Sequence, residues 1–277
     1  MDPFSSVTPE TVNQIQENLI TYFRIYAGLP GTTFVENAYV TWNAGTPGSM
    51  VLRARLSPEQ LEEQIDEIIE QMGQSTTLID WFVFPSCQPP DLAEQVAARG
   101  LAGGPNGEWM LIGKIGGPGG TWMLADLTAL PPAPVMTEPF QVVLVENLQT
   151  LEIWRQCSAA GFGGGDYQEF YAAYARHGFA DQAFSLHYIG YWGDQPVTSG
   201  TLLLAGGIAA LFDISTPPTL RRQGFGSAIS WALLQEAKKR GHTQAYVWSS
   251  NWGKNVYRNV GFVPIALGMR EYEWKRR

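Results

Sequence analysis

The sequence predicts an α/β protein, with mixed sheets flanked by helices, in which residues 1–130 and residues 135–277 form two similar halves. Two observations predict this class. Segments with the period-2 alternation of strands are interspersed with segments that carry apolar residues at helical spacing. The order of these segments in the first half is repeated in the second. The Pro-rich stretch at residues 130–134 between the halves is typical of an extended linker.

The first half begins with a helix. Thr8 is a capping hydroxyl, Pro9 takes the first helical position, and apolar residues at helical spacing continue to Tyr26. The pattern then predicts two paired strands, a helix with an acidic outer face, a strand, a short helix and a last strand, at residues 34–42, 50–55, 58–72, 78–84, 91–99 and 109–115. The glycine-rich run at residues 116–120 precedes no helix pattern, so it is predicted to be a turn.

The second half has its own capping residues. Asn147 is expected to cap a helix that begins at Leu148, and Asp166 to cap another that reaches His177. A further helix is predicted over residues 227–240, because its apolar residues have helical spacing and basic residues precede Gly241. The alternating segments predict strands at residues 140–146, 183–192, 197–204, 207–214, 243–249 and 269–274.

The composition argues against several classes of function. A net charge of −8 over 277 residues disfavours a nucleic-acid partner, which would require a basic surface. The longest apolar run is too short to cross a bilayer, and no basic segment with an apolar core opens the chain. We therefore expect a cytoplasmic protein with no membrane partner. Cys87 and Cys157 lack metal-ligand spacing, so free thiols and no bound metal are expected.

The segment 214–228 follows a predicted strand, opens a predicted helix and has the features of an anion site. The first N–H groups of a helix lack internal partners and together carry about half a positive charge. Gly224 and Gly226 lack a Cβ, so a diphosphate could approach the main chain closely. Arg221 and Arg222 could add charged hydrogen bonds. The spacing fits neither a Walker loop nor a dinucleotide fingerprint.

The pattern Arg-x-x-Gly-x-Gly at residues 221–226 resembles the coenzyme A loop of the GCN5-related N-acetyltransferase (GNAT) superfamily. A second stretch, residues 249–262, is similar to the closing motif of that family, in which a Tyr on the last helix precedes Gly-Phe; here the Tyr is Tyr257. The resemblance covers residues 140–277. From the residues alone, two other interpretations stay open: the loop only starts a helix, and Tyr257 only packs.

The resemblance implies how each part acts. The strands that end at Ile214 and Trp248 should splay apart, so that the pantetheine arm of coenzyme A pairs with the first of them. Tyr257 stands where the family has the general acid that protonates the leaving thiolate. The residues expected to bind acetyl-coenzyme A are Ile214, Ser215, Thr216, Arg221, Arg222, Gln223, Gly224, Phe225, Gly226, Ser227, Ser250, Asn251 and Gly253. Ser250 departs from the Asn of many members, and the adjacent Asn251 is expected to compensate.

The first half lacks the coenzyme loop. Where the loop should stand, residues 53–59 contain no glycine, and Pro58 removes a backbone donor. We therefore expect residues 1–130 to be a degenerate GNAT-like domain that binds no coenzyme, and residues 135–277 to be the complete catalytic domain. The degenerate domain is expected to shape the acceptor site or to stabilise the second domain.

The predicted activity is transfer of an acetyl group from acetyl-coenzyme A directly to the amine of a small molecule or an amino-acid-like acceptor. Three alternatives stay open: a non-catalytic sensor of acyl-coenzyme A, an acyltransferase that uses a longer acyl group, and one that forms an ester. The candidates for a general base are Asp213, Glu169 and His187. The sequence also leaves a homodimer open.

Overall fold

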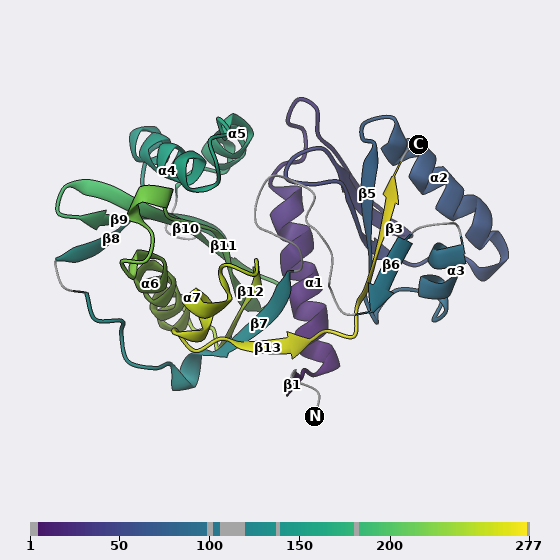
Figure 1. Cartoon of the computed structure of the whole chain (residues 1–277). Coiled ribbons are helices and arrows are strands. Elements are labelled where there is room, and N and C mark those ends of the chain that lie inside the picture. Colours follow the sequence, from purple (N-terminus) through teal and green to yellow (C-terminus); the bar gives the residue numbers. More distant parts are fainter. Residues whose placement is uncertain (1–4, 99–101, 106–119, 137–138, 180–182, 276–277) are drawn as a thin grey trace. The chain divides into compact units, whose positions relative to one another are not determined.

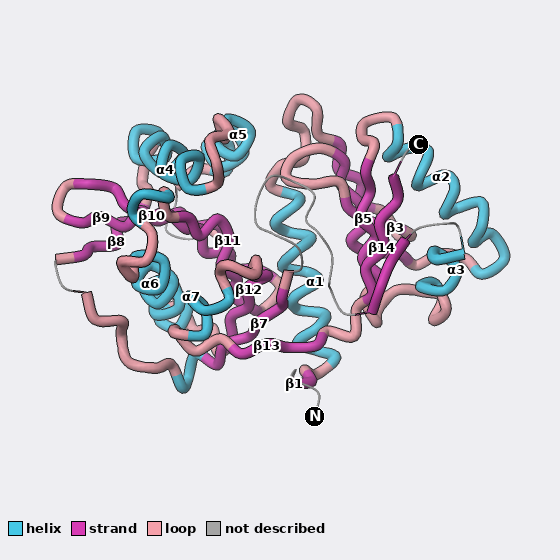
Figure 2. The backbone as a smooth tube through the Cα atoms, viewed as in Figure 1, coloured by secondary structure: helices cyan, strands magenta, loops and turns pink. Residues whose placement is uncertain are grey.

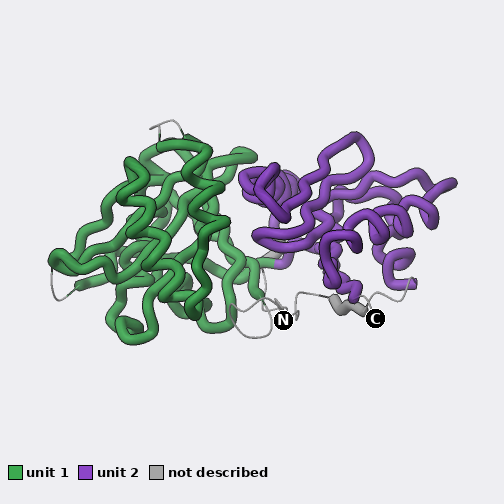
Figure 3. The backbone as a smooth tube through the Cα atoms, turned by 90° about the horizontal axis from the view of Figure 1, so that it is seen from above, with its two compact units in different colours: residues 1–5, 110–265 green, residues 6–109, 266–277 purple. Residues whose placement is uncertain are grey.

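A computed structural model describes most of the chain, namely residues 5–98, 102–105, 120–136, 139–179 and 183–275. The predicted strand at residues 109–115 and most of the predicted turn at residues 116–120 lie outside the described residues. The chain divides into two compact units (Figure 3). Unit 1 comprises Met1–Ser5 and Met110–Ile265, and unit 2 comprises Ser6–Trp109 and Ala266–Arg277.

Unit 1 is built on an eight-stranded sheet. Its strands, in spatial order, are β1 (Ser5–Ser6), β13 (Val263–Ala266), β7 (Thr121–Asp126), β12 (Gln244–Ser249), β11 (Ile208–Ser215), β10 (Gln195–Ala205), β9 (Ser185–Trp192) and β8 (Phe140–Leu144). β11 and β12 run parallel, and the ladders on either side of this pair are antiparallel. This parallel pair is therefore central in the sheet.

Helices cover both faces of this sheet (Figure 1). α4 (Leu148–Gly161) and α5 (Gln168–His177) lie on one face, and α6 (Phe225–Lys239) and α7 (Lys254–Arg258) lie on the other. The stripe expected on α6 is buried, because Ile229, Leu233 and Ala237 pack into the core beneath the sheet. Two short 3₁₀ turns, η2 (Leu127–Ala129) and η3 (Pro218–Leu220), complete the unit.

The described part of unit 2 contains a six-stranded sheet together with the helices α1, α2 and α3, which Figure 2 draws in cyan. The strands, in spatial order, are β2 (Thr33–Glu36), β3 (Val40–Ala44), β4 (Met50–Ala54), β5 (Leu78–Val83), β14 (Arg270–Lys275) and β6 (Ala102–Pro105). β4 and β5 run parallel, as β11 and β12 do in unit 1. The helices are α1 (Pro9–Arg24), which Thr8 caps as predicted, α2 (Leu61–Gly73), which follows the 3₁₀ turn η1 (Pro58–Gln60), and α3 (Leu92–Ala98).

Three strands lie in the sheet of the unit opposite to the half that the predicted boundary gave them: β1 and β7 in the sheet of unit 1, and β14 in the sheet of unit 2. β7 precedes the Pro-rich stretch but lies between β12 and β13 in the sheet of unit 1. β14 ends the described chain but pairs with β5 and β6 in unit 2. The ladder of β7 with β12 spans six residue pairs, and Trp122 stacks on Trp248 with ring centroids 5.1 Å apart. The sequence analysis predicted β14 as a strand but missed β7, and the partner of a strand depends on contacts far apart in the chain.

Two local predictions need correction. The strand predicted over residues 34–42 is a hairpin of β2 and β3, because the Asn37 side chain accepts hydrogen bonds from the N–H groups of Tyr39 and Val40 and turns the chain. The N-cap of α5 is Tyr167 rather than Asp166, although the Asp166 carboxylate still accepts a bond from the N–H of Gln168 at 3.1 Å.

Candidate functional site

The sheet of unit 1 opens between β11 and β12. The ladder joins residues 209–210 to residues 245–246 only, whereas β11 continues to Ser215 and β12 continues to Ser249. The strands therefore separate over their last residues, as the resemblance implied. The edge of β11 along this opening, which includes Ile214, is one to which an extended ligand could add as a strand.

A bulge bends β11 beside the opening. Ser199 of β10 pairs with Ser215, but Thr201 pairs with Phe212, so β11 contains one extra residue there. Asp213, within the bulge, has a φ of 53°, a left-handed conformation that is uncommon for residues other than glycine. Its carboxylate accepts a hydrogen bond from the Tyr174 hydroxyl of α5 at 2.7 Å. The bulge thus directs an acidic side chain toward the helices on one face of the sheet.

The loop after β11 leads into the N-terminus of α6. Gly224 is the N-cap, with a φ of 89°, and it has no side chain with which to cap the helix. The Phe225 ring is buried and stacks on Phe140, with centroids 5.8 Å apart. Phe225 can therefore contribute to an anion site only through its N–H group. The aligned N–H groups at the start of this 15-residue helix attract negative charge.

Gly226 has no packing reason to be glycine. A Cβ added there would meet Val256 at 3.5 Å and Thr216 at 3.8 Å, which are ordinary contact distances, and its backbone is not left-handed. A glycine inside a helix costs about 1 kcal/mol relative to alanine. Its presence is explained if a ligand approaches the main chain at this point. The glycine therefore agrees with the close approach of a diphosphate that the resemblance implies.

The two arginines of the loop differ in their surroundings. The Arg221 guanidinium donates to the main-chain oxygens of Gly161, at 2.7 Å, and of Thr216, at 3.1 Å. Its charge therefore lies at the carbonyl end of α4, where a cation is favourable. Arg222 is exposed and has a φ of 64°, and Gln223 beside it is also exposed. Arg222 is thus the better candidate for contact with an anion.

The hydroxyl groups of Ser215, Thr216 and Ser227, which were predicted to bind the coenzyme, make hydrogen bonds within unit 1. Ser215 Oγ donates to the Cys157 carbonyl at 3.3 Å, and the Ser215 carbonyl accepts from Thr198 at 2.6 Å. Thr216 Oγ1 donates to Thr198 Oγ1 at 3.2 Å, and Ser227 Oγ donates to the Val256 carbonyl at 3.4 Å. These side chains stabilise the loop, so contributions from these residues to ligand binding would come mainly from the main chain.

Tyr257 lies on α7, which follows β12. Its ring packs against Gly253, where a Cβ would come within 2.9 Å of it, and meets Phe262 edge to face. Gly253 is therefore required by the packing of Tyr257. Burial and, to a lesser degree, the negative charge of Asp213 raise the pKa of the Tyr257 phenol above its usual value. The hydroxyl is protonated at neutral pH, as a proton donor must be.

Ser250 and Asn251 form the turn between β12 and α7. The N–H of Gly253 bonds Ser250 Oγ at 3.2 Å, so this hydroxyl shapes the entry to α7. Asn251 is exposed at the tip of the turn. The arrangement places both residues near the end of β12 and assigns neither of them to a ligand.

The three candidate bases are not equivalent. His187 is buried, and its ring nitrogens lie 2.9 Å from Thr201 Oγ1 and 3.5 Å from Ser185 Oγ. Burial, with a smaller effect of the His177 charge, lowers the His187 pKa to about 3, so this ring is a structural element of the core. Glu169 is exposed in the first turn of α5. Asp213, beside the opening of the sheet, is the candidate that the fold brings to the site.

Two tyrosines near Asp213 were missed by sequence reasoning. Tyr174 donates to the Asp213 carboxylate, and burial together with the Asp213 charge raises the pKa of Tyr167 above its usual value. A signal was present, because Tyr167, Phe170 and Tyr174 follow the i, i+3, i+7 spacing of one helix face. The spacing by itself is equally typical of a packing stripe.

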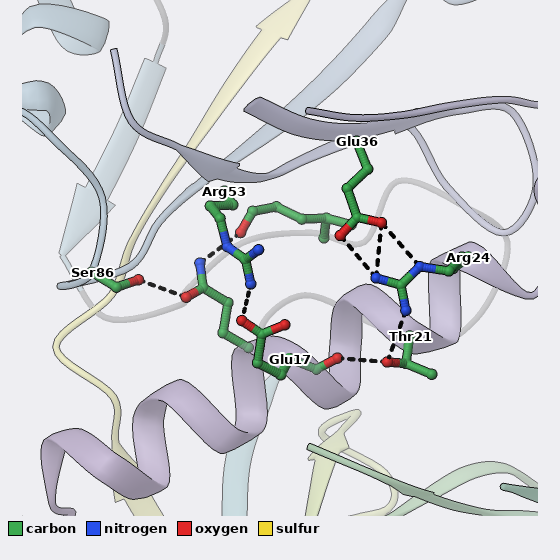
Figure 4. A network of polar contacts seen from close by, with 8 residues as sticks. Glu17, Thr21, Arg24, Glu36, Arg53 and Ser86 are labelled. Atoms are coloured by element: carbon green, nitrogen blue, oxygen red, sulfur yellow. Dashed lines mark hydrogen bonds and ion pairs between the residues drawn. The ribbon is translucent and has the colours of Figure 1, made fainter. Parts of the chain in front are cut away.

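Unit 2 contains a counterpart of the opening, but its own side chains close it. β4 and β5 pair in parallel through Met50 and Val51 only. Beyond this, the buried Gln16 side chain of α1 donates to the Leu52 carbonyl at 2.8 Å and accepts from the Ser86 hydroxyl at 2.6 Å (Figure 4). Main-chain bonds then join the segments around Arg55 and Gln88 again. An added strand would have to displace these bonds.

Further contacts hold α1 against this sheet. Arg24 makes a two-nitrogen contact with the Glu36 carboxylate of β2, at 2.8 and 3.0 Å, and Arg53 of β4 is ion-paired with Glu17 (Figure 4). Arg53 belongs to the stretch where a coenzyme loop would begin. Its charge is directed to α1 in unit 2 instead.

Comparison with known proteins agrees with this architecture. Residues 148–262 match the model of the acetyltransferase (GNAT) family. A GCN5-related N-acetyltransferase from Kribbella flavida superposes with a TM-score of 0.63, at 13% identity, over 93% of this chain and 94% of that protein. A tandem GNAT protein from the clavulanic acid biosynthesis pathway gives 0.58, at 14% identity, over 99% and 97%. A GCN5-related N-acetyltransferase from Sphaerobacter thermophilus gives 0.56, at 11% identity, over 99% and 96%.

These likenesses show the fold. They confirm the predicted class, in which mixed sheets flanked by helices form a tandem GNAT arrangement. No curated protein sequence matches the chain. In the described part of the chain, no three His, Cys, Asp or Glu side chains group as metal ligands would, and none of its helices has the length and apolar content to cross a membrane.

Proposed function

Residues 148–262 form a GNAT-family domain, and from this premise we propose that the protein transfers an acetyl group from acetyl-coenzyme A directly to the amine of a small molecule. One observation carries the proposal. A single strand–loop–helix segment contains both an open sheet edge and a helix N-terminus that no side chain caps. The opening lies between β11 and β12, and the same chain then enters α6 at Gly224 and Gly226.

The segment suits a ligand that is both extended and anionic. The edge of β11 near Ile214 would pair with the pantetheine arm, and the N–H groups from Phe225 to Ser227 would bind the diphosphate. The space at Gly226 supports this assignment, because the protein itself does not require a glycine there. Arg222 would add charge from the loop.

Tyr257 would act at the other end of the ligand. When bound, acetyl-coenzyme A supplies the thioester whose C–S bond breaks as the acceptor nitrogen forms the new C–N bond. The Tyr257 hydroxyl would give its proton to the departing sulfur and regain a proton released by the nitrogen. The electrostatic influence of Asp213 on Tyr257 supports a placement of both groups at the opening.

Unit 2 is proposed to bind no coenzyme. Two observations support this. The Gln16 side chain bonds the Leu52 carbonyl, and main-chain bonds join the segments at Arg55 and Gln88, so both occupy the edge that an added strand would need. The proposed role of unit 2 is to stabilise unit 1 or to shape its acceptor site.

A thiol-release assay with acetyl-coenzyme A and a panel of small primary amines tests the proposed function. Release of coenzyme A that depends on both substrates, with an acetylated amine identified by mass spectrometry, is the expected result. Binding of acetyl-coenzyme A without transfer to any amine would instead indicate a sensor. Faster release with longer acyl thioesters or with alcohols would indicate a different acyl donor or an ester product.

A further inference from the structure

Asp213 is held in a defined orientation. Its left-handed backbone lies within the β11 bulge, and its Oδ2 atom accepts the Tyr174 hydroxyl hydrogen bond at 2.7 Å. The Tyr174 ring is fully buried, with the Trp154 and His187 ring centroids at 5.3 and 3.9 Å. Packing holds the Tyr174 ring in place, and the Tyr174 hydroxyl in turn holds the Asp213 carboxylate. Asp213 itself is only half-buried, so a ligand can reach it.

A row of aromatic rings extends from Tyr174, the residue that donates to Asp213. Tyr167 stacks on Phe162, with centroids 5.7 Å apart, and on Phe170, with centroids 4.7 Å apart. Phe170 in turn meets Tyr174 edge to face at 6.4 Å. Phe162 and Phe170 are half-buried and present apolar ring surface. The row comes from the end of α4 and the first turns of α5, on the same face of the sheet as the Tyr174–Asp213 bond.

The Tyr167 hydroxyl is an unexplained polar group in this row. The residue is 8% exposed, and its hydroxyl makes no hydrogen bond to any residue that the structure describes. Buried hydroxyls nearly always have a partner, so one without a protein partner points to a ligand or a water at that place. Tyr167 is linked to Asp213 through Phe170, on which it stacks, and through Tyr174, which meets Phe170 edge to face and donates to the Asp213 carboxylate.

We propose that Asp213 binds the ammonium group of the acceptor and that Phe162, Tyr167 and Phe170 contact its body, so that the substrate class is a small primary amine carrying an apolar or aromatic group. This inference rests on the proposed function and specifies its acceptor. A carboxylate that a hydrogen bond holds in place pairs with an ammonium ion, and nearby ring faces favour a cation. Tyr174 is a positioning residue, because it acts through Asp213.

The proton balance gives Asp213 a role in transfer as well. The ammonium must lose one proton to become a nucleophile, and Asp213 accepts that proton and releases it to solvent. The nitrogen then forms the C–N bond as the C–S bond breaks, and it loses its second proton. The second proton replaces the one that Tyr257 gives to sulfur. The products are an amide, a thiol and one proton in solution.

The binding test uses 4-fluorophenethylamine as the probe, followed by fluorine NMR on the full chain in the presence of coenzyme A. Wild type and Asp194→Asn, which alters an exposed carboxylate in the β9–β10 turn, should bind the probe equally. Asp213→Asn, which keeps the shape of the side chain and an acceptor for Tyr174, should bind it at least about tenfold more weakly. The neutral analogue 2-(4-fluorophenyl)ethanol should not bind wild type measurably.

Calorimetry with coenzyme A separates this inference from the proposed function. Asp213→Asn and Tyr174→Phe should keep the wild-type affinity for coenzyme A. In Tyr174→Phe the KM for the amine should rise, because the carboxylate is no longer held. In Asp213→Asn turnover should also fall by about 10²–10⁴.

Probe binding that is equal in wild type and Asp213→Asn, equal for the amine and the alcohol, or absent from wild type would overturn the inference. None of these results would contradict the proposed function, as long as wild type binds coenzyme A. Failure of wild type to bind coenzyme A would overturn the proposed function instead.

Discussion

Gly226 lies in the first turn of α6, with a helical backbone and with room for a Cβ. We predict that Gly226→Ala raises the stability of the protein by about 0.5–1 kcal/mol, because alanine loses less backbone entropy in a helix. The same methyl group should weaken the binding of acetyl-coenzyme A about tenfold or more, because it occupies space beside the main chain. Thermal melting and calorimetry measure the two effects.

Gly73→Ala is the matched control for that variant. Gly73 ends α2, and a Cβ there would meet only Trp274, at 3.8 Å. This variant should leave coenzyme binding unchanged. Substitution of Gly224 is less informative, because its φ of 89° strains any other residue whether or not a ligand binds. If Gly226→Ala binds acetyl-coenzyme A as wild type does, the glycine is only a helix start.

Tyr257→Phe keeps the ring contacts with Gly253 and Phe262 and removes the hydroxyl. Turnover should fall by about 10²–10⁴ while the Kd for acetyl-coenzyme A changes little, since the lost interaction acts on the departing sulfur. In wild type, the activity should not fall at pH values near 10, where an ordinary tyrosine ionises, because burial raises the pKa of Tyr257 further. Unchanged turnover in Tyr257→Phe would assign this residue to packing.

The structural position of a residue could be predicted from the sequence where a local motif defined it. The contact partners of a residue could not be predicted where they are distant in sequence. Gly224, Gly226 and Tyr257 belong to short motifs, so their places could be inferred from spacing. The hydrogen bond between Tyr174 and Asp213 joins residues 39 apart in sequence. It depends on a β-bulge that the sequence pattern of β11 does not predict. Arg221 was expected at the anion site, but its carbonyl partners at Gly161 and Thr216 are visible only in three dimensions.

At the scale of elements, β7 is part of the sheet of unit 1. A fragment of residues 135–277 would lack this strand, which pairs with β12 on one side and β13 on the other, and would keep β14 without its partners. We therefore predict that this fragment does not fold cooperatively, whereas a fragment of residues 120–266 gives a single thermal transition. Circular dichroism melts compare the two. A cooperative transition of residues 135–277 at the same temperature would contradict the assignment of β7.

Carboxylates gather on one face of the neighbouring strands β5 and β14. Asp80 pairs with Glu273, and Glu271 lies two residues along the same face. Burial, and then the charge of Glu273, raises the Asp80 pKa to about 7. Burial, and then the charges of Asp80 and Glu273, raises the Glu271 pKa to about 8. In unfolded chains both groups would titrate near pH 4.

The sign of the pH effect follows from these pKa values. Folding favours the protonated form of both groups, so the free energy of unfolding should decrease as the pH rises from about 4 through 8. We predict a higher melting temperature at pH 5.5 than at pH 8.5. Asp80→Asn should raise the melting temperature at pH 8.5 and flatten the pH dependence, while Glu63→Gln, on the exposed face of α2, should do neither. A melting temperature that rises with pH would contradict this assignment.

The order of helices and strands could be predicted for most of the chain, because caps such as Thr8 and Asn147 and the alternation of apolar residues are local signals. Pairing could not. β14 was predicted as a strand and β7 was missed, and the positions of both in the two sheets depend on edges that the rest of each unit provides.

At the scale of the whole molecule, each of the two units has a sheet with a central parallel pair, and the two pairs differ in whether their ends are open. In unit 1 the pair opens at Ile214 and leads to a helix start with Gly224 and Gly226. In unit 2 the corresponding place is closed by Gln16 and Ser86. A duplicated fold with one open and one sealed edge is the basis for assigning the coenzyme to unit 1 alone.

Hydrogen exchange of the full chain, followed by mass spectrometry with and without acetyl-coenzyme A, tests that assignment most directly. Binding to a folded protein slows exchange where main-chain N–H groups are engaged or covered. Protection is predicted in peptides that contain residues 211–216 and 224–228, with no change in peptides that contain residues 52–60. Protection of residues 52–60, or its absence from residues 224–228 at a saturating concentration of acetyl-coenzyme A, would contradict the account.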